Sequence, residues 1–358
     1  MIVDIRKKYK DFELETAFSS KDETLAILGA SGSGKSMTLK CIAGLISPDE
    51  GKIVSNGRVL YDSSAGIDLK PQERDVGYLF QSYALFPNMT VRQNVAIAYG
   101  GTPEKREKDI DALLSKYEIG ELSDRYPVEL SGGQQQRAAL ARIFAYGPQL
   151  LLLDEPFSAL DAFLRENMQA EFKRIIREYD GDVVFVTHNR DEAYKIADSL
   201  VILDEGRLAA AGVLREVFAH PGNVRAARIT GCKNISPIEK TGERSFYAKD
   251  WGTEFFTTEA VGDEHAFAGI RAHDLSPACE DDAVARSGGT PIGRSGGRPA
   301  NSFDIMIVDE IDGLFEKDVI FRVAGGSEDL WWIADKDRDV NAVRALSIAP
   351  EAIMLLES

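Results

Sequence analysis

The chain has 358 residues, 44% of them hydrophobic and 28% charged, a composition typical of globular proteins, and this length predicts roughly two domains. Its formal net charge of −16 argues against a general nucleic-acid binder, because phosphate backbones require clustered Lys and Arg side chains. No apolar run approaches the ~20 residues of a membrane-spanning helix, and the N-terminal MIVDIRKKYK lacks the apolar core of a signal peptide, so we expect a cytosolic protein.

Short apolar runs alternate with helical patterns from the N-terminus to about residue 230. The runs consist almost entirely of apolar residues, as expected for parallel strands that are buried on both faces. They are TLAIL at 24–28, QLLLLDE at 149–155, DVVFVTH at 182–188 and SLVILDEG at 199–206. Because helical patterns separate them, we predict an α/β domain over residues 1–231.

A glycine-rich loop, GASGSGKS at 29–36, joins the first of these strands to the helical pattern KSMTLKCIAGL. The pattern G-x-x-x-x-G-K-[ST] between a strand and a helix is the phosphate-binding P-loop. Its backbone N–H groups can surround a β-phosphate, the Lys35 ammonium can bridge the β- and γ-phosphates, and the Ser36 hydroxyl can bind Mg²⁺. The predicted nucleotide-binding residues of this loop are Gly29, Ser31, Gly32, Ser33, Gly34, Lys35 and Ser36.

Two carboxylates end the apolar strand LLLLDE. The four leucines bury this strand and place Asp154 and Glu155 at its carboxyl end, where open α/β sheets bind their ligands. The Asp154 carboxylate is suited to hold Mg²⁺, directly or through water, and Glu155 can polarise the attacking water. These two residues next to a P-loop predict hydrolysis of a nucleoside triphosphate.

A second phosphate-binding pattern, LSGGQQQR, occurs at 130–137 and runs into the helical stretch AALARIFA. A Ser-Gly-Gly turn at the start of a helix presents free N–H groups and the positive end of the helix dipole to an anion. Unlike the P-loop, this turn contains no lysine. One chain therefore carries two patterns for holding phosphate, of different kinds.

With FQ at 80–81, SALD at 158–161 and TH at 187–188, these motifs resemble the ATP-binding cassette (ABC) ATPases of membrane transporters. The resemblance covers residues 1 to about 230. In that family two cassettes meet head to tail, and each ATP lies between the P-loop of one subunit and the LSGGQ turn of the other. The resemblance therefore implies an α/β ATPase domain with a helical subdomain, a homodimer, and ATP and Mg²⁺ as cofactors.

The resemblance also implies roles for single residues. Tyr9 would stack on adenine, Gln81 would contact Mg²⁺ and the attacking water, and His188 would hydrogen-bond the γ-phosphate. Asp161 would connect the two active sites of the dimer. Met37 stands where many cassettes have Thr or Ser, so the α-phosphate would rely on backbone N–H groups. The residues that would bind the partner's nucleotide are Ser131, Gly132, Gly133 and Gln134.

The sequence changes in character after residue 231. Segments such as RSFYAKDW, FDIMIVDEI, DVIFRVA and LWWIADK predict short antiparallel strands, and hence a small β domain over 232–358. A Gly- and Ser-rich stretch predicts a flexible segment over 280–302. The β domain is similar to the OB-like (TOBE) domain of molybdate, tungstate and sulfate importers, which binds oxyanion in some members and sets dimer contacts in others.

The stretch from 57 to 95 also looks like the cassettes of those oxyanion importers. The resemblance implies a peripheral subunit at the cytoplasmic face of the membrane, bound to permease subunits and served by an external solute-binding protein. Permease helices would dock at SYALFPNMTV, where we expect Tyr83, Leu85 and Phe86 to be exposed. A polyamine or iron importer is the alternative, and a soluble ABC ATPase without transport is a further one. A P-loop kinase would leave LSGGQQQR and SALD unexplained.

Overall fold

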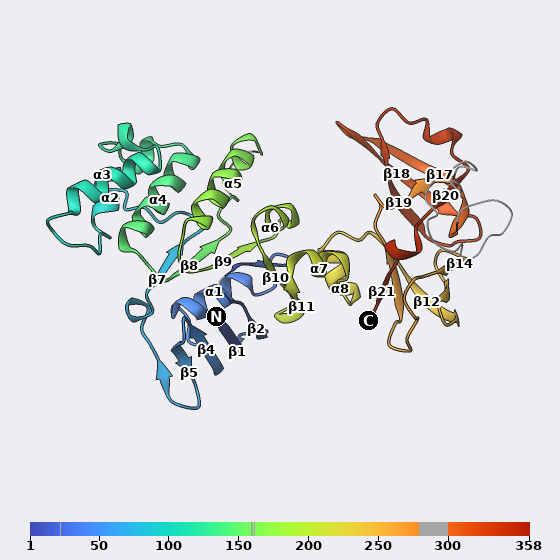
Figure 1. Ribbon diagram of the computed structural model, residues 1–358, viewed down its shortest axis with the longest axis horizontal. Coiled ribbons are helices and arrows are strands. Elements are labelled where there is room, and N and C mark those ends of the chain that lie inside the picture. Colours follow the sequence, from blue (N-terminus) through green and yellow to red (C-terminus); the bar gives the residue numbers. More distant parts are fainter. Residues whose placement is uncertain (22, 159, 161, 279–299) are drawn as a thin grey trace. The chain divides into compact units, whose positions relative to one another are not determined.

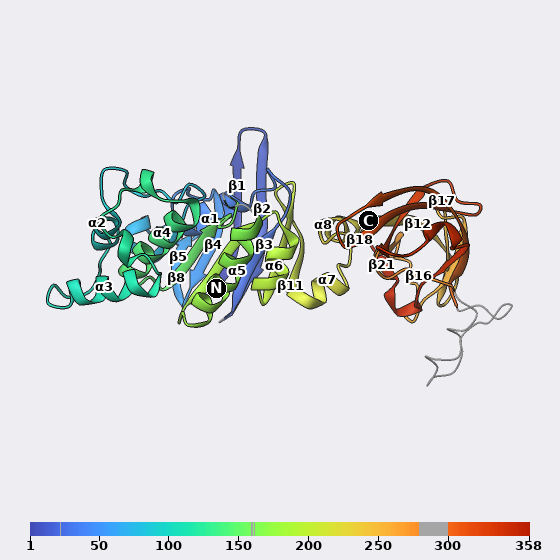
Figure 2. The same cartoon turned by 90° about the horizontal axis from the view of Figure 1, so that it is seen from above.

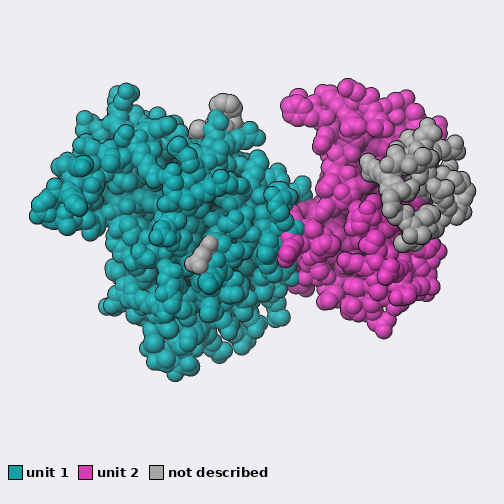
Figure 3. All heavy atoms as spheres, in the orientation of Figure 1, with its two compact units in different colours: residues 1–215 teal, residues 216–358 magenta. Residues whose placement is uncertain are grey.

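The computed structural model divides the chain into two compact units, residues 1–215 and 216–358 (Figure 3). It describes residues 1–21, 23–158, 160, 162–278 and 300–358. Asp161 and residues 280–299 of the predicted flexible segment therefore lie outside the described residues. The predicted domain boundary at 231/232 falls inside the second unit and stays a prediction.

An eleven-stranded sheet forms the centre of the first unit, in the order β6-β5-β4-β1-β2-β11-β10-β3-β9-β8-β7 (Figure 1). From β10 to β7 neighbouring strands are parallel, whereas the pairs β1–β2, β1–β4, β4–β5 and β5–β6 are antiparallel. The strands are β1 (Ile2–Tyr9), β2 (Phe12–Ser19), β3 (Thr24–Leu28), β4 (Glu50–Ser55), β5 (Arg58–Asp62), β6 (Ile67–Asp68), β7 (Val76–Leu79), β8 (Leu150–Asp154), β9 (Asp182–Thr187), β10 (Ser199–Asp204) and β11 (Arg207–Val213). The four strands predicted from apolar runs, β3, β8, β9 and β10, are confirmed and are buried almost throughout.

Helices cover this sheet and form a subdomain beyond its end. Helix α1 packs against β8 and β9, and α6 packs against β3 and β9. Helices α2 and α3 pack on α4 at one end of the unit, next to β7 (Figures 1 and 2). The helices of the chain are α1 (Lys35–Ala43), α2 (Val91–Ala96), α3 (Arg106–Lys116), α4 (Gly132–Tyr146), α5 (Ala162–Arg177), α6 (Arg190–Ile196), α7 (Leu214–Ala219) and α8 (Val224–Ile229). The group of α2, α3 and α4 is the predicted helical subdomain.

The parallel half of the sheet brings the predicted site residues to one edge. Strands β3, β9, β8 and β7 are neighbours and point in the same direction. Their carboxyl ends lead into the P-loop, His188, Glu155 and Phe80–Gln81 respectively. Since ligands of open α/β sheets bind outside the carboxyl ends of the strands, this edge is the expected position of the site.

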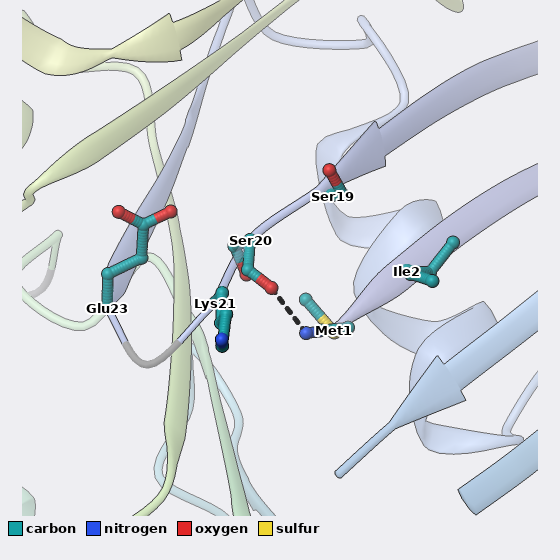
Figure 4. Close-up of a pocket in the computed structure, with 6 residues that line it drawn as sticks. All are labelled: Met1, Ile2, Ser19, Ser20, Lys21 and Glu23. Carbon is teal, nitrogen blue, oxygen red and sulfur yellow. Dashed lines mark hydrogen bonds between the residues drawn. The ribbon is translucent and has the colours of Figure 1, made fainter. Parts of the chain in front are cut away.

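Strand β1 is held at both ends of its length. At its start, the amino group of Met1 donates a hydrogen bond to the carbonyl of Ser20 (Figure 4). The same nitrogen lies 3.6 Å from a carboxylate oxygen of Asp182, the buried first residue of β9. The full length of β1 pairs with β2, from Ile2 to Tyr9. The Met1 contacts hold the start of β1, and the pairing with β2 extends to its far end at Tyr9.

The second unit contains two antiparallel five-stranded sheets, in the orders β14-β13-β12-β15-β21 and β16-β20-β17-β18-β19. The strands are β12 (Asn234–Gly242), β13 (Ser245–Ala248), β14 (Thr253–Phe256), β15 (Phe267–Ile270), β16 (Ser276–Pro277), β17 (Ser302–Asp312), β18 (Glu316–Val323), β19 (Asp329–Asp335), β20 (Ala345–Ser347) and β21 (Met354–Leu356). One core joins both sheets, with the rings of Phe255 and Phe303 in edge contact at 5.6 Å. The predicted β domain of short antiparallel strands is therefore confirmed.

The last residues of the segment predicted to be flexible, 300–302, belong to the fold. Asn301 is buried, and its side-chain amide exchanges two hydrogen bonds with the backbone of Phe256. Ser302 is the first residue of β17. The Gly- and Ser-rich pattern therefore extends into the start of a strand.

A buried arginine closes the C-terminal end of the P-loop helix α1. The Arg74 guanidinium donates to the carbonyls of Cys41 and Ile42, at 2.8 and 2.9 Å, and to the carbonyl of Leu69 at 2.7 Å. It also donates to the carboxylate of Asp68, at 2.8 Å. Carbonyls in the last turn of a helix have no partner within the helix. The Cys41 carbonyl also accepts from the Gly44 amide at 3.2 Å, so Arg74 is a second donor there, and it is the side-chain donor to the Ile42 carbonyl.

We expect Arg74→Ala to lower the free energy of unfolding by about 2–4 kcal/mol, because buried carbonyls lose a charged donor. Urea unfolding followed by circular dichroism measures this change. The matched control is Arg58→Ala, since the side chain of Arg58 is exposed; its effect should stay within about 0.5 kcal/mol. Equal unfolding midpoints for the two variants would show that Arg74 does not hold the end of α1.

Candidate functional site

The P-loop wraps around the first turn of α1. Gly34, the residue before this helix, has φ +101°, and a Cβ there would come within 2.9 Å of Leu14. The Lys35 ammonium lies across the loop and donates to the carbonyls of Gly29 and Ala30, at 2.9 and 2.7 Å. Burial lowers the pKa of Lys35, while the carboxylates of Glu155 and Asp154 raise it. The loop thus presents one buried ammonium group to the edge of the sheet.

A hollow of about 640 Å³ opens over the P-loop and reaches Tyr9. This volume is typical of pockets for small molecules. It is lined by Tyr9, Phe12, Ser31, Gly32, Gly34, Lys35, Ser36, Met37, Lys40, Ile46 and Glu155. Tyr9 is 54% exposed, and the Lys10 ammonium lies over its ring, 5.7 Å from the centroid. Met37 lines the hollow with a thioether and also packs against the core of the unit.

Asp154 is held by two hydroxyl groups at the end of β8. Its Oδ1 accepts a hydrogen bond from the Ser36 hydroxyl at 2.7 Å, and its Oδ2 accepts one from the Tyr78 hydroxyl at 3.0 Å. Burial raises the pKa of Tyr78, and the charge of Asp154 raises it further, so this hydroxyl remains a donor. The side chain of Asp154 is only 8% exposed.

The Ser36 and Asp154 oxygens are a suitable pair for Mg²⁺. This ion prefers hard oxygen ligands and usually takes one or two carboxylates, with nucleotide phosphates and water completing its coordination. Within the described ranges, no group of three or more His, Cys, Asp and Glu residues forms a metal cluster. The donor set therefore fits a metal ion that arrives with a nucleotide.

Glu155 and His188 face each other across β8 and β9. The backbone amide of Glu155 donates to the Val186 carbonyl at 3.1 Å, and Glu155 has a left-handed φ of +47°. Its Oε1 lies 3.2 Å from Nδ1 of His188, whose side chain is 55% exposed. A half-exposed imidazole beside a carboxylate can donate to an incoming phosphate oxygen.

Hydrogen bonds next to Glu155 and His188 hold the backbone on either side. The Thr187 hydroxyl donates to the buried carboxylate of Glu192 at 2.6 Å, which joins the end of β9 to helix α6. Burial raises the pKa of Glu192, and the hydrogen bond from Thr187 opposes this rise. The Gln81 amide lies 3.4 Å from the Ser158 hydroxyl, which donates to the Glu155 carbonyl at 3.0 Å. Gln81 is therefore connected to the residue that follows the buried strand.

The segment after Gln81 is a turn held by an arginine of α4. Tyr83 and Ala84 have left-handed φ values of +60° and +46°, and their carbonyls accept hydrogen bonds from Arg142 at 3.0 and 2.7 Å. The Arg142 guanidinium also lies over the ring of Phe86, at 5.6 Å. Phe86 is 46% exposed, as expected, and Leu85 is half-buried, but Tyr83 is 4% exposed and the expectation of an exposed Tyr83 is wrong. Its ring is buried within the turn whose carbonyls Arg142 holds.

The LSGGQ turn starts helix α4 in the helical subdomain. Ser131 is the N-cap residue: its hydroxyl accepts from the Gln134 amide at 3.4 Å, and the Gln134 side chain accepts from the Ser131 amide at 2.9 Å. This reciprocal pair satisfies the backbone amides of Ser131 and Gln134. The N–H groups of Gly132 and Gly133, in the first turn, have no partner within the helix. None of the four residues lines the hollow over the P-loop.

The structure thus brings most of the predicted residues of the P-loop side together. Tyr9, the P-loop and Glu155 share one hollow, while Asp154 contacts Ser36 directly. Sequence reasoning missed Tyr78, Arg142 and Glu192. A hydroxyl inside the apolar run VGYLFQ was the available signal for Tyr78, since a buried hydroxyl requires a partner. No local signal points to the other two.

Comparisons with known proteins agree with these observations. Residues 16–158 match the family model described as ABC transporter. The sequence is 38% identical to a sulfate/thiosulfate import ATP-binding protein of Synechococcus elongatus over 76% of this chain and 73% of that protein. It is 40% identical to the corresponding protein of Synechocystis over 64% and 62% of the two chains. It is also 41% identical to a spermidine/putrescine import ATP-binding protein of Oleidesulfovibrio alaskensis over 62% and 59%.

The alignments with the last two relatives thus span only about three fifths of each relative's length. Among solved structures, the chain is similar to an ATP-binding cassette that was solved as a dimer in a post-hydrolysis state, bound to ADP and Pi. That likeness has a TM-score of 0.51 and 30% identity, and it covers 60% of this chain and 98% of the other. Of the helices in the described ranges, none is long and apolar enough to cross a membrane.

Proposed function

Since this chain belongs to the ABC transporter family, we propose that it binds ATP with Mg²⁺ and hydrolyses it to power an importer. The observation that supports this most directly is the single hollow that contains Tyr9, the P-loop and Glu155, with Asp154 bonded to Ser36. In this proposal adenine stacks on Tyr9, and the Lys35 ammonium and P-loop N–H groups hold the phosphates. The α-phosphate depends on backbone N–H groups, because Met37 offers no hydroxyl.

The residues at the sheet edge would then carry out the hydrolysis. The Mg²⁺ ion, when bound, would neutralise phosphate charge, with Ser36, Asp154 and Gln81 as its protein contacts. The Glu155 carboxylate would accept the proton of the attacking water, and the His188 imidazole would donate to the γ-phosphate. Hydrolysis would release free phosphate, whereas a P-loop kinase would form a phosphorylated product.

We further propose that the catalytic unit is a head-to-tail homodimer. The LSGGQ turn is built to hold an anion and yet does not line the hollow of its own chain. A second copy would place its nucleotide against Ser131, Gly132, Gly133 and Gln134, and Asp161 would connect the two sites. This arrangement accounts for two phosphate-binding helix starts in one chain, since each ATP needs one of each kind.

The proposed partners are permease subunits of a membrane importer, at its cytoplasmic face, and indirectly an external solute-binding protein. Phe86, beside the turn held by Arg142, is an exposed large apolar side chain within 82–91 and would contribute to docking. The relatives' names favour sulfate or a related oxyanion such as molybdate, with a polyamine as the alternative. The β domain of the second unit would bind an oxyanion or contribute dimer contacts.

We expect ATP hydrolysis to increase when the chain is reconstituted with its permease and binding protein and given sulfate, molybdate or tungstate. Phosphate release in proteoliposomes measures this, with spermidine and ferric iron as competing solutes. A response to spermidine or iron alone would overturn the oxyanion proposal and leave the ATPase proposal standing. Absence of free phosphate with every solute would contradict the ATPase proposal itself.

A further inference from the structure

The two carboxylate oxygens of Asp154 have different partners. Oδ1 accepts a hydrogen bond from Ser36, which is itself a proposed contact of Mg²⁺. Oδ2 accepts one from Tyr78, which does not line the hollow over the P-loop. A hydrogen bond to one carboxylate oxygen fixes the rotation of the carboxylate about its Cβ–Cγ bond, and so decides which oxygen faces the ligand.

The fold holds Tyr78 in place for this contact. Strand β7 lies beside β8 in parallel register, with Tyr78 paired to Leu152, two residues before Asp154. The Tyr78 ring contacts that of Phe80, with 4.4 Å between centroids. Because the ring lies on a strand and is packed against Phe80 and the hydrophobic core of the unit, its hydroxyl has little freedom to leave Oδ2. The same strand leads, three residues later, to Gln81.

We propose that Tyr78 is a positioning residue for the metal ion: it holds Oδ2 of Asp154 so that Oδ1, beside Ser36, is directed to Mg²⁺. This inference rests on the proposed function, because it assumes that a nucleotide brings Mg²⁺ to Ser36 and Asp154. Outer partners of metal-binding carboxylates are known to matter, and their loss typically reduces metal affinity by roughly 10–100-fold.

The consequence is a change in how strongly Mg²⁺ supports nucleotide binding. Tyr78→Phe removes one oxygen atom and keeps the ring that packs on Phe80. Affinity for ATP without metal should remain, since it depends on the P-loop and Tyr9. Affinity for ATP with Mg²⁺ should fall, because the freed carboxylate no longer directs one oxygen to the ion.

The experiment measures equilibrium binding, so it does not depend on catalytic activity. We would titrate ATP into the Glu155→Gln protein by calorimetry, once with EDTA and once with saturating Mg²⁺. The dissociation constant with EDTA divided by that with Mg²⁺ measures the coupling between metal and nucleotide. In the Tyr78→Phe, Glu155→Gln protein this ratio should fall by about 10-fold or more, with the EDTA value unchanged. An unchanged EDTA value also shows that the variant is folded.

The matched control is Tyr179→Phe in the same Glu155→Gln background. The Tyr179 hydroxyl is also partly buried and donates to a carbonyl, that of Pro148, at 2.9 Å, but it does not contact Asp154. Its loss should leave the coupling ratio within about twofold of the Glu155→Gln parent. Asp154→Asn in that background is the positive control and should reduce the coupling at least as much as Tyr78→Phe.

Three outcomes decide the matter. A coupling ratio that falls in Tyr78→Phe and Asp154→Asn but not in Tyr179→Phe supports the inference. If Asp154→Asn loses coupling and Tyr78→Phe keeps it, Tyr78 only packs against its neighbours, and the inference fails while the proposed function stands. If the Glu155→Gln parent binds no ATP under either condition, the proposed function fails and this inference fails with it.

Discussion

Replacing Glu155 by glutamine is expected to reduce ATP hydrolysis by roughly 10²-fold or more, because the attacking water loses its base. ATP and Mg²⁺ binding should persist, since they depend on the P-loop and on Ser36 and Asp154. Glutamine has nearly the shape of glutamate, and the backbone amide of residue 155 would still donate to Val186. The change therefore removes charge and basicity with little effect on the left-handed backbone.

Phosphate release at saturating ATP measures the catalytic loss, and calorimetry measures ATP binding in the same preparation. Glu118→Gln is the matched control, because Glu118 also has a left-handed φ, of +53°, and lies in the helical subdomain, paired with Arg137. Its turnover should stay within about twofold of the parent, as an exposed ion pair contributes little. Parent-like turnover in Glu155→Gln would exclude this carboxylate as the base.

The parallel half of the sheet could be predicted because its strands are local patterns. TLAIL and LLLLD are buried on both faces, and each ends in a residue type that carries chemistry. The antiparallel half lacks that signal. In β1 and β2 buried and exposed residues alternate, so IVDIRKKY and FELETAFS contain no continuous apolar run. The place of β1 depends on pairing with β4 and on the contact of Met1 with Asp182, and that of β2 depends on pairing with β1 and β11.

The site residues likewise divide into those within sequence motifs, which could be predicted, and those outside them, which could not. Ser36 and Asp154 lie 118 positions apart, yet each belongs to a recognisable motif, and their contact follows from two neighbouring elements of the fold. Tyr78 and Arg142 carry no motif, because their roles exist only through partners supplied by tertiary structure. Tyr83 illustrates the reverse error. An aromatic residue in a loop is predicted to be exposed, but Tyr83 is 4% exposed, and its burial depends on the tertiary structure around the turn.

The second large effect is expected at the LSGGQ turn. In the Glu155→Gln protein, which should bind ATP without consuming it, ATP should hold two copies together, and Ser131→Arg should abolish this dimerisation. The arginine would place a long side chain where the helix start must approach the partner's γ-phosphate. It would also replace the residue that caps α4, a loss that costs only about 1 kcal/mol. The dimer should therefore weaken far more than the fold does.

Light scattering after size-exclusion chromatography, with and without ATP, measures the dimer. Ser115→Arg, on the exposed side of α3, controls for the added charge and bulk, and it should dimerise as the Glu155→Gln parent does. Ser131→Ala separates the loss of the hydroxyl from the added bulk, because it removes the hydroxyl and adds no atoms, so its dimer should be weaker than the parent's but stronger than that of Ser131→Arg. The Ser131→Arg and Ser115→Arg proteins should be compared at equal ATP saturation. Each copy binds nucleotide through its own P-loop, so a difference in dimerisation then reflects the LSGGQ turn and not nucleotide affinity. If Ser131→Arg closes with ATP as well as Ser115→Arg does, the turn does not contact a partner's nucleotide, and its glycines only start a helix.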